Sequence, residues 1–252
     1  MTVLGGSGQD AGLASRLDVE MVPGFDALGA VAFTTTRRTG SFAWQSQEPA
    51  ADVFARWTTL ADVLTPYAGR LATAHQVHGD TVLAHVSGWD GWLRARAADG
   101  HVAPSPGTAM AVTVADCVPV FIVHPRGATA VVHSGWRGTL ANVTGRAIDR
   151  MVAAGFAAGE LVIHCGPAIC GSCYEVSPDV YRQLTGRTVP HPTPVDLRTL
   201  IADGARAAGV AEVSISPWCT RCHNDRFFSH RCGDDGRQLG VIVWGAGASQ
   251  SG

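Results

Sequence analysis

Three apolar segments between residues 109 and 132 follow one another with no room for a helix between them. They run over residues 109–115, 118–123 and 128–132, and each has the length of a strand. A fold of strictly alternating strands and helices has a parallel sheet and needs a long crossover between successive strands. These segments therefore predict mixed sheets instead.

The rest of the chain shows the same excess of strands over helices. Further strands are predicted at residues 30–36, 81–86, 161–164, 213–215 and 239–244, and helices at residues 51–64, 140–151, 197–208 and directly after Ser177. Ser177-Pro178 and Asp196 are typical of helix starts. Because no linker or repeat divides the pattern, we predict a single domain over residues 1–252, with a flexible N-terminal segment of about residues 1–24.

Composition and charge exclude several classes of partner. A net charge of −2 and a pI near 6.5 give no electrostatic reason to expect nucleic acid or an anionic membrane as a partner. No apolar run approaches the ~18 residues that cross a bilayer, and residues 1–20 lack the pattern of a signal peptide. We therefore expect a cytoplasmic protein whose seven cysteines stay mostly reduced.

All 19 basic residues are arginine. Without lysine, a P-loop, a Schiff-base mechanism and a pyridoxal phosphate linkage are excluded in their usual forms. Guanidinium groups remain as the candidates for binding anions such as phosphate.

Three residues at or near the ends of strand-like segments have the chemistry of a metal site. They are His78 in the sequence Gln-Val-His-Gly-Asp, Cys117 after Ala115-Asp116, and His133. Two imidazoles and one thiolate leave a coordination position open, as in catalytic zinc sites, and copper is the alternative metal. We predict that His75, three residues before His78, is not a ligand. Without a metal, Cys117 and His133 are also sufficient for a cysteine nucleophile.

Five segments make the prediction more specific. In chain order they are QVHGD, TVADCVPV, VVHSGWRGT, GPAICGSCYEV and CTRCHNDRFFSHR. They resemble the motif series of the YfiH-type family, long labelled laccase-domain or polyphenol oxidoreductase proteins, over about residues 37–244. The resemblance implies an α/β (α+β) fold, a single-domain α/β/β/α sandwich with mixed sheets (CNF/YfiH-like). It also implies one metal at His78, Cys117 and His133, and a purine nucleoside phosphorylase activity with accompanying adenosine deaminase activity.

The resemblance also assigns roles to individual residues. The catalytic set comprises His78, Cys117, His133 and Arg137, and the substrate-binding set comprises Arg37, Asp99, Glu175, Ser229, Arg231 and Arg237. The implied substrates are phosphate and a purine nucleoside such as adenosine, inosine or methylthioadenosine. An Asn-Leu-rich segment and an Asn-Arg pair expected after the first strand are not recognisable in residues 40–57.

The two reactions make different demands on such a site. Deamination needs an activated water to attack C6 of adenine, which a metal with an open position provides. Phosphorolysis needs an anion held at C1′ of the ribose, for which Arg37, Arg137, Arg231 and Arg237 are the candidates. Asp99, Asp116 and Glu175 are candidates for an acid, a base or a contact with ribose hydroxyls.

Two other function classes remain open. One is a hydrolase that cleaves an amide with Cys117 and His133, and the other is a laccase-like copper polyphenol oxidase. The ten histidines include no His-x-His pair, so we do not expect the relay of several coppers that a multicopper oxidase needs. The oligomeric state is not predicted.

Two Cys-x-x-Cys pairs complete the candidate motifs. Cys219-Thr-Arg-Cys222-His223 matches the attachment pattern of c-type haem, but that chemistry needs export and no export signal is present. Cys170, Cys173, Cys219 and Cys222 also have the spacing of a four-cysteine zinc site. Alternatively, Cys173 and Cys219 are positions shared with the family and the other two are incidental. We favour this second interpretation, which predicts no haem and no essential cysteine pair.

Overall fold

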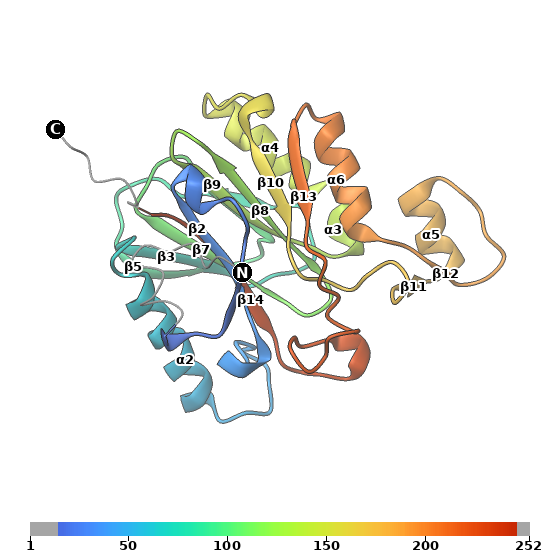
Figure 1. The fold of residues 1–252 in the computed structure, drawn as a ribbon, viewed down its shortest axis with the longest axis horizontal. Helices are drawn as coiled ribbons and strands as arrows, with labels where there is room; N and C mark the ends of the chain where they lie inside the picture. Colours follow the sequence, from blue (N-terminus) through green and yellow to red (C-terminus); the bar gives the residue numbers. More distant parts are fainter. Residues whose placement is uncertain (1–14, 246–252) are drawn as a thin grey trace, which may run out of the picture.

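The computed structural model describes residues 15–245, and two six-stranded sheets form its centre (Figure 1). The first sheet has the order β1 (Val19–Met21), β2 (Ala30–Thr35), β14 (Gln238–Trp244), β7 (Thr108–Val114), β3 (Arg70–Ala74) and β5 (Gly91–Ala95). Its first four strands pair antiparallel, whereas β7, β3 and β5 pair parallel. The sheet is therefore mixed, as predicted.

The second sheet is also mixed. Its order is β13 (Glu212–Ile215), β10 (Val162–Cys165), β8 (Val118–His124), β9 (Ala128–Ser134), β6 (Gly100–Ala103) and β4 (Val82–Ala84). Only the outer pairs, β13 with β10 and β6 with β4, are parallel. A separate two-stranded ladder joins β11 (Glu175–Val176) to β12 (Thr193–Pro194).

The helices cover the two outer faces of the paired sheets (Figure 1). They are α2 (Ala50–Leu64), α3 (Trp136–Leu140), α4 (Val143–Ala153) and α6 (Leu197–Ala207), whereas α5 (Pro178–Thr185) stands apart from both sheets. Helix α2 packs Trp57 and Leu60 against the first sheet, and α4 and α6 pack Met151 and Ile201 against the second. A third apolar cluster, which includes Met110 and Phe121, fills the space between the sheets. The predicted α/β/β/α sandwich is confirmed.

The N-terminal prediction is only partly testable. Residues 1–14 lie outside the described residues. Residues 15–24 are not a loose segment, because β1 pairs with β2 and the side chains of Leu17 and Val22 are buried. For this part, the expectation of a flexible segment is wrong, since its apolar side chains complete two of the core clusters.

The connection after β7 determines where the candidate site forms. Strand β7 belongs to the first sheet and β8 to the second, so residues 115–117 cross from one sheet to the other. Because β3 and β7 are parallel neighbours, their carboxyl ends reach the same edge. The loop after β3 and the crossover after β7 therefore lie side by side, next to the end of β9.

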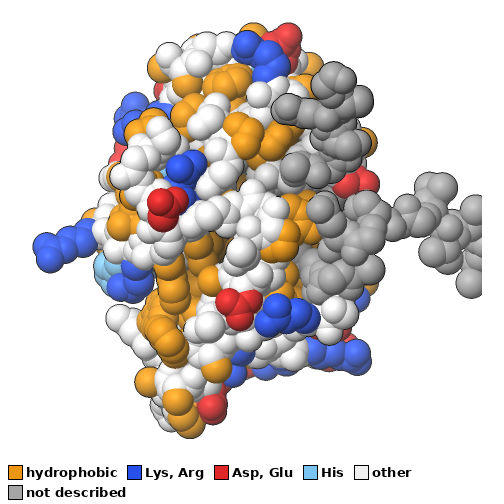
Figure 2. All heavy atoms as spheres, turned by 90° about the vertical axis from the view of Figure 1, so that its left-hand side faces the viewer, with side chains coloured by type: hydrophobic (Ala, Val, Ile, Leu, Met, Phe, Trp, Pro, Cys, Tyr) orange, Lys and Arg blue, Asp and Glu red, His pale blue; other side chains and the backbone are white. Residues whose placement is uncertain are grey.

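Two surface properties bear on the predicted partners. On the face drawn in Figure 2, hydrophobic side chains reach the surface between arginine and acidic side chains, so positive charge on this face is dispersed. Among the residues that the structure describes, no helix is long and apolar enough to cross a membrane.

Candidate active site

Three side chains from different elements converge at the shared edge of the two sheets. His78 lies in the loop after β3, Cys117 in the crossover between β7 and β8, and His133 near the end of β9. Their ligand atoms all lie within 4.8 Å of one another, and the two imidazole rings meet edge to face at 4.7 Å. Zinc bonds of about 2.0–2.3 Å reach all three atoms after small side-chain movements. The donor set therefore fits one metal ion.

Asp99 is fully buried and holds two of these ligands in place. Its Oδ1 accepts hydrogen bonds from Nδ1 of His133 (2.9 Å) and the backbone N–H of His78 (2.9 Å), while Oδ2 accepts from the N–H groups of Val77 (3.1 Å) and Gly79 (2.8 Å). His78 has a left-handed backbone with φ 60°, which costs about 1–3 kcal/mol and needs such restraint. The bond at Nδ1 leaves Nε2 of His133 free to bind a metal.

The electrostatics of the site favour a thiolate. Burial by itself raises the pKa of Cys117, but the imidazoles of His133 and His78 beside the sulfur lower this pKa to about 6. Burial lowers the pKa of His133, whereas Cys117 and Asp99 raise it to about 9. A thiolate is both the form that binds zinc and the form that attacks carbon. The charge distribution thus suits a metal centre and a cysteine nucleophile alike.

Gly135 leaves space for the ligands at the turn into α3. A Cβ atom at this position would lie 2.8 Å from Sγ of Cys117 and 3.2 Å from Cδ2 of His78. Both distances are closer than ordinary van der Waals contact, so a side chain here would displace two ligands. The glycine of the Ser-Gly-Trp-Arg segment is therefore a requirement of the site.

A pocket of about 870 Å³ opens over the three ligands. This volume lies within the range of small-molecule sites, about 300–1,000 Å³. Aromatic side chains in its wall offer apolar surface to a planar ring; they are Trp44, Trp136 and Tyr174. Trp57 stacks against Trp44 and is itself buried. Three of the predicted arginines, Arg137, Arg231 and Arg237, also line it.

Arg137 and Arg231 give one side of the pocket a positive charge. The Arg137 guanidinium lies 4.3 Å from the centre of the Trp136 ring, and that of Arg231 lies 4.7 Å from the centre of the Tyr174 ring. Within residues 15–245, neither arginine forms an ion pair with a carboxylate. Burial and the Cys117 thiolate raise the pKa of Tyr174, and both arginines oppose this shift. The two charges therefore act on the same part of the pocket.

Four of the predicted substrate-binding residues do not line this pocket, so their roles in substrate binding stay predictions. The carboxylate of Asp99 accepts four hydrogen bonds from within the protein. Arg37 is paired with Asp234 at 2.5 Å, so its charge is neutralised. The Glu175 side chain is exposed, and only its carbonyl faces an arginine. Ser229 is fully buried, and its Oγ has no hydrogen-bond partner among the described residues.

Tyr174 and Trp44 line the pocket but were not predicted from the sequence. Tyr174 directly precedes Glu175, and adjacent residues of an extended segment point to opposite sides, so only one of the two faces the pocket. The Tyr-Glu-Val segment pointed to this part of the pocket, but the prediction named Glu175, whereas the side chain that lines the pocket is Tyr174. Trp44 lies in residues 40–57, where no motif was recognised. His75 also lines the pocket but is not one of the three converging ligands.

Comparisons with known proteins show the family and the fold of the chain. Residues 33–245 match the model of a family described as multi-copper polyphenol oxidoreductase laccase. A Mycobacterium bovis protein named purine nucleoside phosphorylase is 35% identical over 205 residues, which are 78% of this chain and 80% of that protein. A protein named adenosine deaminase RL5, from an unknown prokaryotic organism, is 33% identical over 150 residues, which are 53% of this chain and 56% of that protein. The solved structure of a Bacillus licheniformis hypothetical protein, YfiH, superposes with a TM-score of 0.80 at 22% identity, covering 90% of this chain and 96% of that one.

Proposed function

The chain belongs to the family described as multi-copper polyphenol oxidoreductase laccase, and we propose that it is a metal-dependent purine nucleoside phosphorylase with adenosine deaminase activity. The observation that carries the proposal is the pairing of a three-ligand centre with two arginines that no acid neutralises, in one pocket. The names of the relatives support the same two reactions.

In the proposed phosphorolysis, the arginines of the pocket bind the phosphate. Arg137 and Arg231 bind phosphate through charge-assisted hydrogen bonds and hold one of its oxygens near C1′ of the ribose. That oxygen forms a bond to C1′ as the bond from C1′ to the purine nitrogen breaks. The base leaves with the electron pair and takes up a proton, which yields free purine and ribose 1-phosphate.

In the proposed deamination, the three metal-binding side chains of the pocket provide the activated water. His78, Cys117 and His133 would hold a zinc ion, or alternatively copper, which lowers the pKa of a bound water to near 7. Asp99 keeps His133 in the orientation and tautomer that bind a metal. The aromatic wall excludes water and holds the purine ring over the ligands.

A laccase activity is not favoured by the described residues. Within residues 15–245, two groups of side chains could hold a metal, namely the set of three in the pocket and a separate set of four cysteines. Neither has the clustered imidazoles that several coppers need, and the pocket has one thiolate and two imidazoles for one ion.

One observation favours a second candidate, a cysteine hydrolase. Cys117, His133 and Asp99 form a thiol–imidazole–carboxylate series in which Asp99 holds Nδ1 of His133. The same order of groups activates the nucleophile in cysteine hydrolases. This candidate predicts amide or ester hydrolysis that continues after chelation and stops when Cys117 is alkylated.

The phosphorylase proposal predicts that adenine is released from adenosine only when phosphate is supplied. Ribose 1-phosphate should appear in equal amount, and inosine should appear more slowly by deamination. Chromatography of the products with and without phosphate measures both reactions. Adenine release at an equal rate in phosphate-free buffer would show simple hydrolysis and contradict the proposal.

Arg137→Ala should weaken phosphate binding without removing the metal. Loss of a charge-assisted contact worth about 1.5–3 kcal/mol raises the KM for phosphate by about ten- to a hundredfold. Arg182→Ala is the matched control, because Arg182 does not line the pocket and forms an exposed ion pair with Asp179 on α5. An unchanged KM for phosphate in Arg137→Ala, measured in protein of normal metal content, would move the anion site elsewhere.

A further inference from the structure

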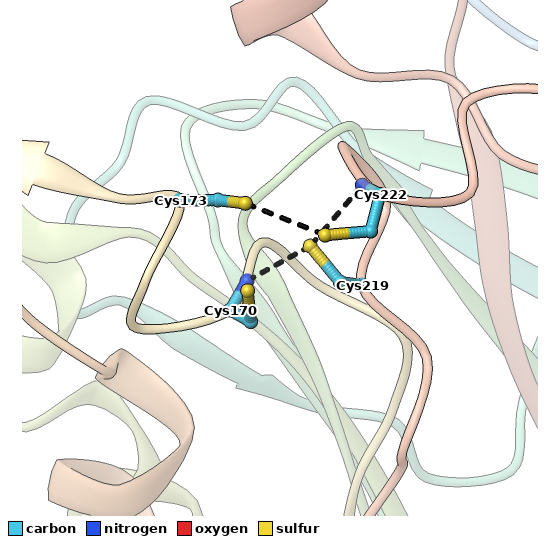
Figure 3. Close-up of side chains that lie close together, drawn as sticks. All are labelled: Cys170, Cys173, Cys219 and Cys222. Atoms are coloured by element: carbon cyan, nitrogen blue, oxygen red, sulfur yellow. Dashed lines mark hydrogen bonds between the residues drawn. The ribbon is translucent and has the colours of Figure 1, made fainter.

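We propose that Cys170, Cys173, Cys219 and Cys222 bind a structural zinc ion, separate from the metal centre in the pocket. The four sulfur atoms come from two loops and point toward one another (Figure 3), and all lie within 4.8 Å of one another. The favoured sequence interpretation, in which two of these cysteines are incidental, is therefore replaced by its alternative. The inference does not depend on the proposed function.

The fold brings the two pairs together because their loops leave parallel strands. Strands β10 and β13 are parallel neighbours, so their carboxyl ends reach one edge of the second sheet. The loops continue side by side through a parallel bridge between Ala168 and Cys219. Each loop then contributes one Cys-x-x-Cys turn, the unit from which closed zinc sites are built.

The separation of one pair of sulfur atoms fits a tetrahedral ion better than a disulfide. Sγ of Cys173 lies 3.4 Å from Sγ of Cys222. A zinc ion with four bonds of about 2.3 Å places its sulfur atoms about 3.8 Å apart, whereas a disulfide requires about 2.05 Å. The observed separation is close to the value for zinc.

The backbone around the cluster is arranged to stabilise thiolates. The N–H groups of Cys170 and Cys222 both point at Sγ of Cys219, at 3.2 and 3.4 Å. Sγ of Cys170 lies 3.1 Å from the hydroxyl of Ser172. Tetrahedral sites of four thiolates take zinc or iron, and zinc has the higher intrinsic affinity of the two divalent ions. We therefore assign zinc.

The position of the cluster gives the ion a structural role. Beyond Cys173 its loop carries Tyr174, and beyond Cys222 the other loop leads to Arg231, and both side chains line the pocket. Thr220, between the second pair, donates a hydrogen bond of 2.6 Å to buried Asp116, which is adjacent to Cys117. An ion here ties together two loops that form one wall of the pocket.

Metal analysis of the full chain tests this site. Zinc, copper and iron are measured together in the wild type, in Cys222→Ser and in Cys232→Ser. Cys222 is exposed, so its replacement is compatible with folding, and Cys232 is an exposed cysteine outside both clusters that serves as control. We expect Cys222→Ser to lose about one zinc ion per chain relative to the wild type, and Cys232→Ser to lose none. Equal zinc in all three proteins, or iron in place of zinc, would overturn the assignment.

Two further measurements do not depend on replacing a cysteine. Cobalt substitution should give the visible absorption of a tetrahedral thiolate site, and His133→Ala should retain that spectrum because its metal site is separate. Denatured, metal-free protein should show all seven thiols. A shortfall of about two thiols without bound zinc would mean a disulfide in place of the ion. If the wild type binds zinc at the four cysteines but holds no metal in the pocket, only the proposed function is contradicted.

Discussion

Asp99→Ala is expected to lower the free energy of unfolding by about 3–5 kcal/mol, although Asp99 does not line the pocket. The change leaves three backbone N–H groups and Nδ1 of His133 without their acceptor in a fully buried place. The left-handed backbone of His78 also loses its restraint. We expect metal affinity to fall by about 10- to 100-fold in the same variant, because Asp99 orients one ligand directly and another through its backbone.

Urea denaturation and metal titration measure these two effects. Asp80→Ala is the matched control, since Asp80 lies in the same loop but is half exposed and forms a surface ion pair with Arg146. Its replacement should change the free energy of unfolding by less than about 0.5 kcal/mol. An Asp99→Ala protein as stable as Asp80→Ala, with its metal retained, would show that Asp99 is not the support that its hydrogen bonds indicate.

The strands that the sequence predicts best are those buried on both faces. Strands β8 and β9 are buried throughout and mostly apolar, because one face meets the other sheet and the other face meets the helices. Strand β5 was missed, since it is an edge strand whose residues are mostly exposed and so shows no apolar alternation. Strand β6 was missed because a glycine and a histidine occupy its start. Its burial depends on neighbours that the local sequence does not specify.

The ligands of the pocket were predictable because each is a rare residue type at or near the end of a strand. The contacts of Arg37 and Asp99 could not be predicted from the sequence, because they depend on partners distant in sequence. Asp234, which neutralises Arg37, lies 197 residues away, and the loop that Asp99 supports lies about 20 residues before it. Motifs show which residue types are present, whereas charge neutralisation and hydrogen bonding decide which of them face a substrate.

Cys117→Ser is expected to remove the metal from the pocket and to lower the proposed deaminase activity by about a thousandfold or more. A serine hydroxyl is a much weaker zinc ligand than a thiolate, and a metal that activates water contributes several kcal/mol to a reaction. Gly135→Ala should have the same effect while all three ligands remain, since its Cβ would lie 2.8 Å from the Cys117 sulfur. Gly204→Ala in α6, with nothing within 4 Å of the added atom, is the control and should retain metal and activity.

Chelation of the wild type separates metal chemistry from thiol chemistry, because it removes the metal and leaves the Cys117 thiol in place. Chelation should abolish deamination, and zinc should restore it. Metal content and the rates of adenine and inosine formation are measured before and after chelation. Undiminished metal in both Cys117→Ser and His133→Ala would refute the ligand assignment. A chelated wild type that still hydrolyses an amide, and loses this activity when Cys117 is alkylated, would instead assign the thiolate of Cys117 as the nucleophile, with His133 as its base and Asp99 as the group that orients the base.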